Sequence, residues 1–278
     1  MGAWVGWRGM SHVTTADRDG VRVLTVDRPP ANAMDVELLG ELVEAVDALA
    51  AGSPEAVVLA GREGYFSAGV DLKAVPGYGP DEQRKMVEGI NRMALGAYSL
   101  PCPVVCAITG HAIAGGFVLA LCGDHRVAST AGRYGLTEVK VGVPYPQAAI
   151  GVVRAELGPP AARLLALGNR LVDAAACVQL GAFDEAVPPP QVLGRAMAVA
   201  RELAAMPAPV YARTKEALRG ATIAALREAA ENDPLREGWV ERSAQPAAQQ
   251  PAQPPTQQAQ PQAQQPVQPQ AQPPVQPS

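Results

Sequence analysis

Strand-type and helix-type hydrophobic patterns alternate along most of the chain. Residues 21–26, VRVLTV, alternate apolar and polar positions after an Asp-Arg-Asp-Gly turn, and this pattern predicts a β-hairpin. From residue 36 to residue 51 apolar side chains recur at helical spacing, which predicts a helix capped by the carboxylate of Asp35. Two continuous apolar runs, AVVLAG at 56–61 and PVVCAITG at 103–110, are typical of strands buried on both faces. Together these elements predict an α/β fold with largely parallel strand pairing.

A turn rich in small residues follows each of the two buried strands. REGYFSAGVDLK at 62–73 follows the first strand, and HAIAGGFVLALCGD at 111–124 follows the second. Small side chains let backbone N–H groups approach a ligand closely, and the start of a helix adds the positive end of its dipole. Gly115 and Gly116 open an apolar run that predicts such a helix, so the turns favour a site for a negatively charged oxygen.

Composition and charge limit the ligands and partners that this protein can bind. The chain has 278 residues, of which 48% are hydrophobic, so it can bury one sizeable core. Its formal net charge of -4 gives no basic field that would attract nucleic acid, and an anionic ligand must therefore be met locally. No uninterrupted run of about 18 apolar residues is present, which argues against a membrane partner and leads us to expect a cytoplasmic protein.

Cysteine and histidine usage gives no sign of metal or thiol chemistry. The chain has only three histidines. All four cysteines lie in apolar stretches without the close paired spacing of a metal site: Cys102, Cys106, Cys122 and Cys177. We predict that these cysteines are reduced core residues, and that the protein needs neither a metal nor a redox cofactor.

An ordered set of motifs carries a family resemblance. Residues 65–72, YFSAGVDL, and 109–116, TGHAIAGG, resemble the two oxyanion-hole signatures of the crotonase superfamily, the enoyl-CoA hydratase and isomerase group. DRPPANAM at 27–34 is similar to a motif near the start of that family's proteins. LGNR at 167–170 and GAFDEAV at 181–187 are similar to two later motifs.

The resemblance spans about residues 12–242 and implies an α/β fold in which ββα units form a spiral. We assign this spiral core to residues 11–190 and a helical region to 191–242, and the resemblance implies that this helical region assembles the protein into a homotrimer or a dimer of trimers. Residues 1–10 are predicted to be an N-terminal extension. The tail at 243–278 has no charged residue and ten of the 27 prolines, a composition that predicts disorder. We expect the tail to be inert, and a partner-binding arm is the alternative.

The resemblance implies that the ligand is an acyl-CoA, whose CoA belongs to the substrate and is no separate cofactor. It implies that the backbone N–H groups of Ala68 and Gly115 hold the thioester oxygen as it becomes an enolate. Lys215 matches a lysine that meets a CoA phosphate in relatives, and a solvated helix residue is the alternative. The residues implied to line CoA, mostly through their backbone, are Ala31, Ala33, Ala68, Gly69, Val70, Asp71, Leu72 and Lys73.

The resemblance also locates the acid-base groups. Hydratases of the family carry one glutamate three residues after the oxyanion glycine and a second glutamate in a later motif. The first position is Val118 in this chain, which cannot titrate, whereas Glu138 in YGLTEVKVGVP matches the second. The alternative for Glu138 is a surface carboxylate beside Lys140.

Other polar residues near these motifs receive structural interpretations. Asp71 and Asp124 are interpreted as hydrogen-bond acceptors for the backbone, and His111 is interpreted as a spacer beside its turn. Tyr145 lies in VPYPQA at 143–148, where many relatives have a Gly-Gly pair. We expect it to border the acyl pocket, either as a polar phenol or as a side chain that shapes the cavity.

A single carboxylate favours isomerisation over hydration. Hydration requires an activated water and a proton delivered to the α-carbon, work that relatives share between two carboxylates, and Val118 would leave such a water without a partner. Moving a double bond requires one base, which takes a proton from C2 and returns it to C4 while the oxyanion donors hold the dienolate. The motif at 27–34 is also closer to the Δ3,Δ2-enoyl-CoA isomerase branch. We therefore favour an isomerase with Glu138 as its base.

Three alternatives stay open from the sequence. An enoyl-CoA hydratase needs another group to position the water. A single glutamate also suits other chemistry on a CoA enolate, such as decarboxylation or carbon-carbon bond formation. A non-catalytic acyl-CoA-binding protein or scaffold would bind a CoA ester without turnover.

Overall fold

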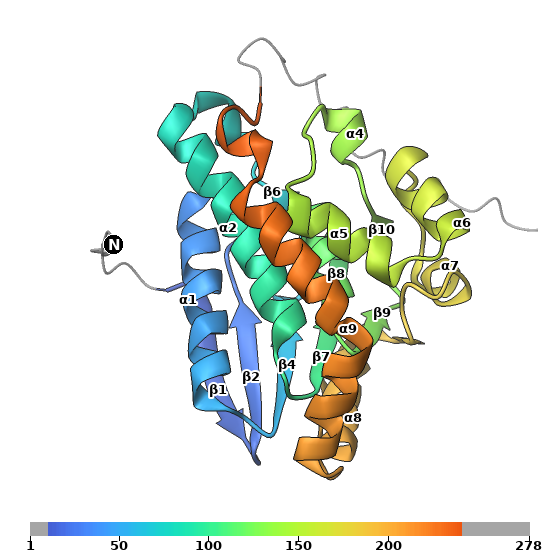
Figure 1. Cartoon of the computed structure of the whole chain (residues 1–278). Helices are drawn as coiled ribbons and strands as arrows, with labels where there is room; N and C mark the ends of the chain where they lie inside the picture. The colour runs from blue at the N-terminus through green and yellow to red at the C-terminus, as the bar shows by residue number, and fades with distance from the viewer. Residues whose placement is uncertain (1–10, 241–278) are drawn as a thin grey trace, which may run out of the picture. The chain divides into compact units, whose positions relative to one another are not determined.

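A six-stranded sheet organises residues 11–240, which are the residues that this computed structural model describes (Figure 1). The strands follow the order β1 (Val13–Arg18), β2 (Val21–Val26), β4 (Ala56–Ala60), β7 (Val104–Ile108), β9 (His125–Ser129) and β11 (Glu185–Val187). β1 and β2 are antiparallel, and every other neighbouring pair in this sheet is parallel. The predicted hairpin and the predicted α/β fold with parallel pairing are confirmed. The extension predicted at 1–10 and the tail predicted at 243–278 lie outside the described residues.

Both faces of the sheet are buried, as the continuous apolar runs predict. Successive residues of a strand point to opposite faces. In β4, Val57 packs into a cluster with α1 (Val36–Gly52) and α2 (Pro80–Ser99), whereas Val58 packs into a second cluster with α8 (Val192–Ala204). Figure 1 shows α1 and α2 side by side over one face of the sheet. The sheet is therefore the middle layer of three.

The first helix begins where the sequence predicts. The Asp35 carboxylate accepts a hydrogen bond of 2.9 Å from the backbone N–H of Leu38, which satisfies one amide of the first turn. The Asp35 carboxylate also pairs with the guanidinium of Arg28. The helix buries one apolar stripe against the sheet, and its last residue, Gly52, precedes Ser53 in the left-handed conformation.

Two small sheets extend from the carboxyl ends of the main strands. β4 leads into β5 (Gly64–Ser67), and β7 leads into β8 (Gly110–Ile113), and these short strands pair in parallel. β10 (Tyr134–Gly135) adds to β8 on its other side. A further pair consists of β3 (Ala33–Met34) and β6 (Gly69–Val70). These pairings bring the two small-residue turns together, although more than 40 residues separate their main strands in the sequence.

Helices and turns complete the part of the chain that the structure describes. The short elements are η1 (Val75–Gly77), α3 (Gly115–Leu121), α4 (Glu138–Val141), α6 (Pro159–Ala162), η2 (Arg163–Leu167), α7 (Ala174–Gln179), η3 (Pro189–Gln191) and η4 (Pro234–Arg236). α5 (Gln147–Glu156) and α9 (Ala208–Glu231) are longer and pack on each other. Within residues 11–240, we find no helix whose length and apolar character would allow it to cross a membrane. The predicted domain boundaries and the predicted homotrimer stay predictions.

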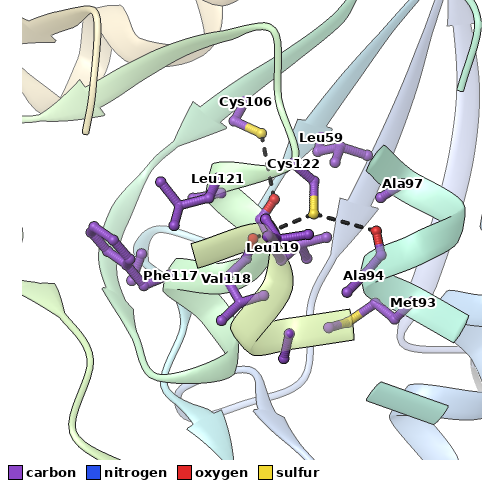
Figure 2. Packing of buried hydrophobic residues seen from close by; sticks show 14 of the residues in the cluster. Leu59, Met93, Ala94, Ala97, Cys106, Phe117, Val118, Leu119, Leu121 and Cys122 are labelled. Carbon is purple, nitrogen blue, oxygen red and sulfur yellow. Dashed lines mark hydrogen bonds between the residues drawn. The ribbon is translucent and has the colours of Figure 1, made fainter. Parts of the chain in front are cut away.

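The cysteines are free and belong to the packing of the fold. Cys106, Cys122 and Cys177 are buried, and burial raises the pKa of each thiol. Figure 2 shows Cys122 between α3 and α2, where its thiol donates to the carbonyls of Ala94 at 3.5 Å and Val118 at 3.4 Å. The predicted core role is confirmed for these three cysteines, whereas Cys102 is only partly buried.

Candidate active site

A largely apolar cavity lies beside the two small-residue turns. Its empty volume is about 480 Å³, which includes space open to solvent. The predicted site residues that line it are Ala68, Val70, Leu72, Gly115, Val118, Glu138 and Tyr145. The sequence therefore predicts the location of the cavity, although it does not identify all of the cavity walls.

The turn before α3 presents a free backbone donor to the cavity. Ala114 has a φ of 53°, and its carbonyl accepts the N–H groups of Phe117 at 2.8 Å and Val118 at 3.0 Å. Gly115 is the first residue of α3, so its own N–H has no acceptor within the helix. Among the described residues, no backbone or side-chain acceptor is recorded for it outside the helix either. The Gly115 amide is therefore available to a ligand, and its contact with a thioester oxygen stays a prediction.

The amide of Ala68 does not fit its predicted role. Its N–H donates to the carbonyl of Ala31 at 2.9 Å, a bond that ties the turn after β5 to the segment before β3. A backbone amide has one hydrogen to donate. The prediction that Ala68 supplies an oxyanion donor is therefore wrong, although Ala68 does line the cavity.

Val70, two residues later, presents its amide in a suitable direction. β6 pairs in parallel with β3, with Met34 opposite Val70, and the N–H of Asp71 donates to the carbonyl of Met34 at 2.8 Å. In a parallel pair of strands, the backbone of one residue forms hydrogen bonds with the two neighbours of the residue opposite it, here with the neighbours of Val70. The N–H of Val70 itself therefore points away from β3. Gly69 packs so closely on the other turn that a Cβ there would lie 3.0 Å from the Gly115 nitrogen. The amides of Val70 and Gly115 are therefore close neighbours at the cavity.

Glu138 is the acidic side chain of the cavity and the first residue of α4. It is 7% exposed, so the alternative of a surface carboxylate beside Lys140 is wrong. Its Oε2 accepts a hydrogen bond of 2.7 Å from the hydroxyl of Tyr145. Burial raises the pKa of Glu138 to about 7, against the opposing effects of Tyr145 and nearby backbone amides. A carboxyl group with this pKa can both accept and return a proton near neutral pH.

An apolar side chain, Val118, occupies the position where a second acidic side chain would lie. It lies on α3 three residues after Gly115, is 1% exposed and packs in the apolar cluster of Figure 2. Its side chain offers no hydrogen bond to a water molecule in the cavity. Glu138 and Tyr145 are the titratable side chains among the described residues that line the cavity.

The segments predicted to line CoA come together around β3 and β6. Ala31 and Ala33 adjoin residues 68–73 through the pairing of the two strands and the bond from Ala68 to Ala31. Leu72 lines the cavity, and the next residue, Lys73, is exposed to solvent. Contacts of these residues with CoA stay a prediction.

Lys215 does not fit its predicted role at a phosphate. The Nζ of Lys215 lies 2.7 Å from Oδ2 of Asp124 and donates to the carbonyl of Cys102 at 3.0 Å. Its side chain is 8% exposed, and burial lowers its pKa against the opposing effect of Asp124. Neither the phosphate contact nor the alternative of a solvated helix residue is correct, because the ammonium is buried and bonded inside the protein.

We expect Lys215→Met to lower the free energy of unfolding by about 1–3 kcal/mol, because the substitution removes a buried partner of Asp124. Arg219, which lies 2.9 Å from Oδ1 of Asp124, would remain to compensate part of the charge. Urea denaturation with linear extrapolation measures the change. Lys140→Met removes an exposed lysine and serves as the matched control. Equal stability of both variants would contradict this structural role.

The remaining polar residues behave as interpreted. Asp71 accepts the N–H of Lys73 at 2.9 Å, and Asp124 accepts the N–H of Val104 at 2.8 Å. Nδ1 of His111 accepts the N–H of Arg133 at 3.0 Å, and burial lowers the pKa of this histidine. All three side chains stabilise the fold around the turns. The described residues contain no cluster of three or more metal-ligating side chains.

Sequence reasoning did not assign several residues of the cavity wall, among them Ile90, Thr137 and Trp239. Ile90 is a buried residue of α2, and its apolar side chain alone does not distinguish a cavity wall from the core. Trp239 follows η4, and its indole Nε1 donates to the carbonyl of Pro144 at 2.8 Å. Asp233 fixes this segment because its Oδ2 accepts bonds from Asn91 and from the N–H of Gln147, each at 2.8 Å. No sequence pattern identifies Trp239 as part of the cavity wall, because the residues that it contacts lie on distant segments of the chain.

Known proteins resemble this chain in both sequence and structure. A putative enoyl-CoA hydratase from Thermus thermophilus is 35% identical over 216 residues, which cover 76% of this chain and 85% of the relative. The mitochondrial enoyl-CoA delta isomerase 1 of Homo sapiens is 33% identical over 212 residues, which cover 74% of this chain and 70% of the relative.

Among solved structures, a probable enoyl-CoA hydratase from Mycobacterium tuberculosis has a TM-score of 0.75 and 31% identity, and covers 80% of this chain and 94% of its own. Another structure of that protein describes it as an enoyl-CoA isomerase. The sequence model of enoyl-CoA hydratases/isomerases matches residues 16–235. The predicted superfamily and its fold are thus confirmed, and this chain belongs to the enoyl-CoA hydratase/isomerase family.

Proposed function

We propose that the protein is a Δ3,Δ2-enoyl-CoA isomerase that uses Glu138 as its single acid-base group. The observation that carries this proposal is the pairing of one buried carboxylate with an apolar Val118 at the position where hydratases of the family have a second glutamate. The substrate would bring its own CoA, and the chemistry would use only this carboxylate and two backbone amides.

The thioester oxygen would accept hydrogen bonds from the N–H groups of Val70 and Gly115. Both residues line the cavity that contains Glu138. As the C2 proton leaves, negative charge moves onto this oxygen, and fixed amide donors stabilise that charge in a site with little water. The start of α3 adds the positive end of its backbone dipoles.

One carboxylate is sufficient for the proposed reaction, because it takes up a proton and then returns it. The Glu138 carboxylate takes a proton from C2, and the electrons of that bond form a dienolate with the thioester carbonyl. The carboxylic acid then gives the same proton to C4, which bonds it with the electrons of the C3–C4 double bond. The C1–C2 electrons move to form the C2–C3 double bond, and the electrons on oxygen restore the thioester carbonyl. The carboxylate is regenerated, so no water is consumed.

Hydration is the second candidate because hydratase is a frequent name among the relatives. It requires a water held for attack at C3. The apolar Val118 lowers the capacity of the cavity to hold that water. We therefore expect hydration to be the slower reaction.

A panel of CoA esters tests this assignment. We expect a 3-enoyl-CoA to be converted to its conjugated 2-enoyl isomer, and crotonyl-CoA to be hydrated slowly or not at all. Chromatographic separation of the products, with malonyl-type esters included, measures the specificity. Rapid hydration of crotonyl-CoA would overturn the isomerase assignment, and tight binding without turnover of any ester would identify a binding protein.

The rate of isomerisation should depend on pH through Glu138. The base form is the carboxylate, which is populated above its pKa of about 7. We expect kcat/KM to fall by about tenfold per pH unit below this value and to level off above it. A pH profile for a 3-enoyl-CoA measures this limb. A rate independent of pH between 5.5 and about 8 would contradict Glu138 as the base.

A further inference from the structure

The hydroxyl of Tyr145 is the one side-chain partner that the structure records for the Glu138 carboxylate in the described part of the chain. The distance from Tyr145 Oη to Glu138 Oε2 is 2.7 Å, and both side chains line the cavity. This bond engages one of the two carboxylate oxygens. The cations on the packed elements α4 and η2, Lys140 and Arg163, are both exposed to solvent.

The backbone around Tyr145 is restrained from both sides. Pro144 and Pro146 flank it, and a proline fixes its own φ and restricts the residue before it. The carbonyl of Pro144 accepts the indole N–H of Trp239, and Pro146 is the cap residue that precedes α5. Tyr145 therefore reaches the carboxylate from a rigid segment, which suits a residue that orients another group.

We propose that Tyr145 is a positioning residue for Glu138, which holds Oε2 so that Oε1 alone handles the substrate proton. This inference rests on the proposed isomerase function. A carboxylate that turns freely could leave the proton on the oxygen remote from C4. A carboxylate held at Oε2 keeps the proton on Oε1 in both steps, because Oε2 can accept the phenol hydrogen in either protonation state.

The same bond also opposes hydration. A water activated by Glu138 would need an acceptor oxygen of this carboxylate. The phenol engages Oε2, so such a water would compete with the substrate proton for Oε1, and Val118 offers the water no second partner. Tyr145 thus favours proton transfer over the capture of water.

The electrostatic effect of Tyr145 gives a readout that is independent of catalysis. A hydrogen bond donated to a carboxylate stabilises its charged form and lowers its pKa. Burial raises the pKa of Glu138, and Tyr145 opposes this effect. Removing the hydroxyl in Tyr145→Phe should therefore raise the pKa of Glu138 further, by about one unit.

Carbon-13 NMR titration of labelled glutamate carboxyls in the full-length protein measures this pKa, with Glu138→Gln identifying the signal. Tyr65→Phe is the matched control, because Tyr65 stacks on His111 with ring centroids 4.8 Å apart and does not line the cavity. We expect the Glu138 signal to shift its midpoint upward in Tyr145→Phe and to stay unchanged in Tyr65→Phe. An unchanged midpoint in Tyr145→Phe would overturn the proposal whether or not the protein isomerises 3-enoyl-CoA.

Kinetics then test the consequence for the reaction. We expect Tyr145→Phe to lower kcat for a 3-enoyl-CoA by about tenfold, with little change in KM, and to move the acidic limb of the pH profile upward. The ratio of crotonyl-CoA hydration to isomerisation should rise. Wild-type kcat and an unmoved profile in a variant that binds the ester normally would refute the positioning role. A wild-type protein without isomerase activity would instead refute the proposed function and leave the titration as the test of Tyr145.

Discussion

Glu138→Gln is expected to lower the turnover of a 3-enoyl-CoA by about 10²- to 10⁴-fold, the range that a positioned general base contributes. The amide has nearly the same shape and can still accept the hydrogen bond of Tyr145, but it cannot take a proton from C2. Because Glu138 is 7% exposed in an apolar cavity, solvent cannot easily supply a replacement base. Steady-state assays of the conjugated product measure the loss.

Two measurements separate lost chemistry from lost structure in Glu138→Gln. Calorimetric titration with a non-reactive CoA thioester should give a dissociation constant close to that of the wild type, because the variant retains the cavity. Glu37→Gln changes an exposed glutamate in the first turn of α1 and should retain full activity. Retention of the wild-type rate by Glu138→Gln would show that another group moves the proton.

Local patterns in the sequence predict the fold and the location of the site. The continuous apolar runs at 56–61 and 103–110 predict strands buried on both faces, and packing against helices on both sides confirms this. Asp35 predicts the start of α1 because capping depends on residues within one turn. The apolar helix after Gly115 likewise follows from adjacent residues. Each of these features is determined by neighbours in the chain.

The sequence fails to predict contacts that depend on partners far along the chain. Lys215 is 91 residues from Asp124, and its burial there follows from the packing of α9 on the core. The amide of Ala68 is taken by Ala31 because β3 pairs with β6, a pairing that no periodicity reveals. Trp239 closes the cavity wall through contacts with Pro144 and α2. Such residues are identified only once tertiary structure defines their surroundings.

Gly69→Ala is expected to lower kcat/KM by about 10²- to 10³-fold, because it separates the two amides at the cavity. Gly69 has a φ of +80°, which a residue with a Cβ rarely adopts. A Cβ at this position would lie 2.7 Å from the Ala114 Cβ and 2.8 Å from the Ile113 carbonyl oxygen. These atoms belong to or adjoin the backbone, so the turn that holds Gly115 must move. Assays at saturating and subsaturating 3-enoyl-CoA measure the loss.

A second glycine provides the control for Gly69→Ala. Gly194 lies in α8, and a Cβ added there would meet no atom within 4 Å, so Gly194→Ala should retain the wild-type rate and gain slightly in stability. Gly69→Ala should also lose stability, and rates are therefore compared per folded protein, at a temperature where circular dichroism shows both variants to be folded. Under these conditions, a variant that has only lost stability should show the wild-type kcat per folded protein. A variant whose oxyanion donors are displaced should show a lower kcat. A folded Gly69→Ala variant with wild-type kcat would mean that the close packing of the two turns is not required for the stabilisation of charge.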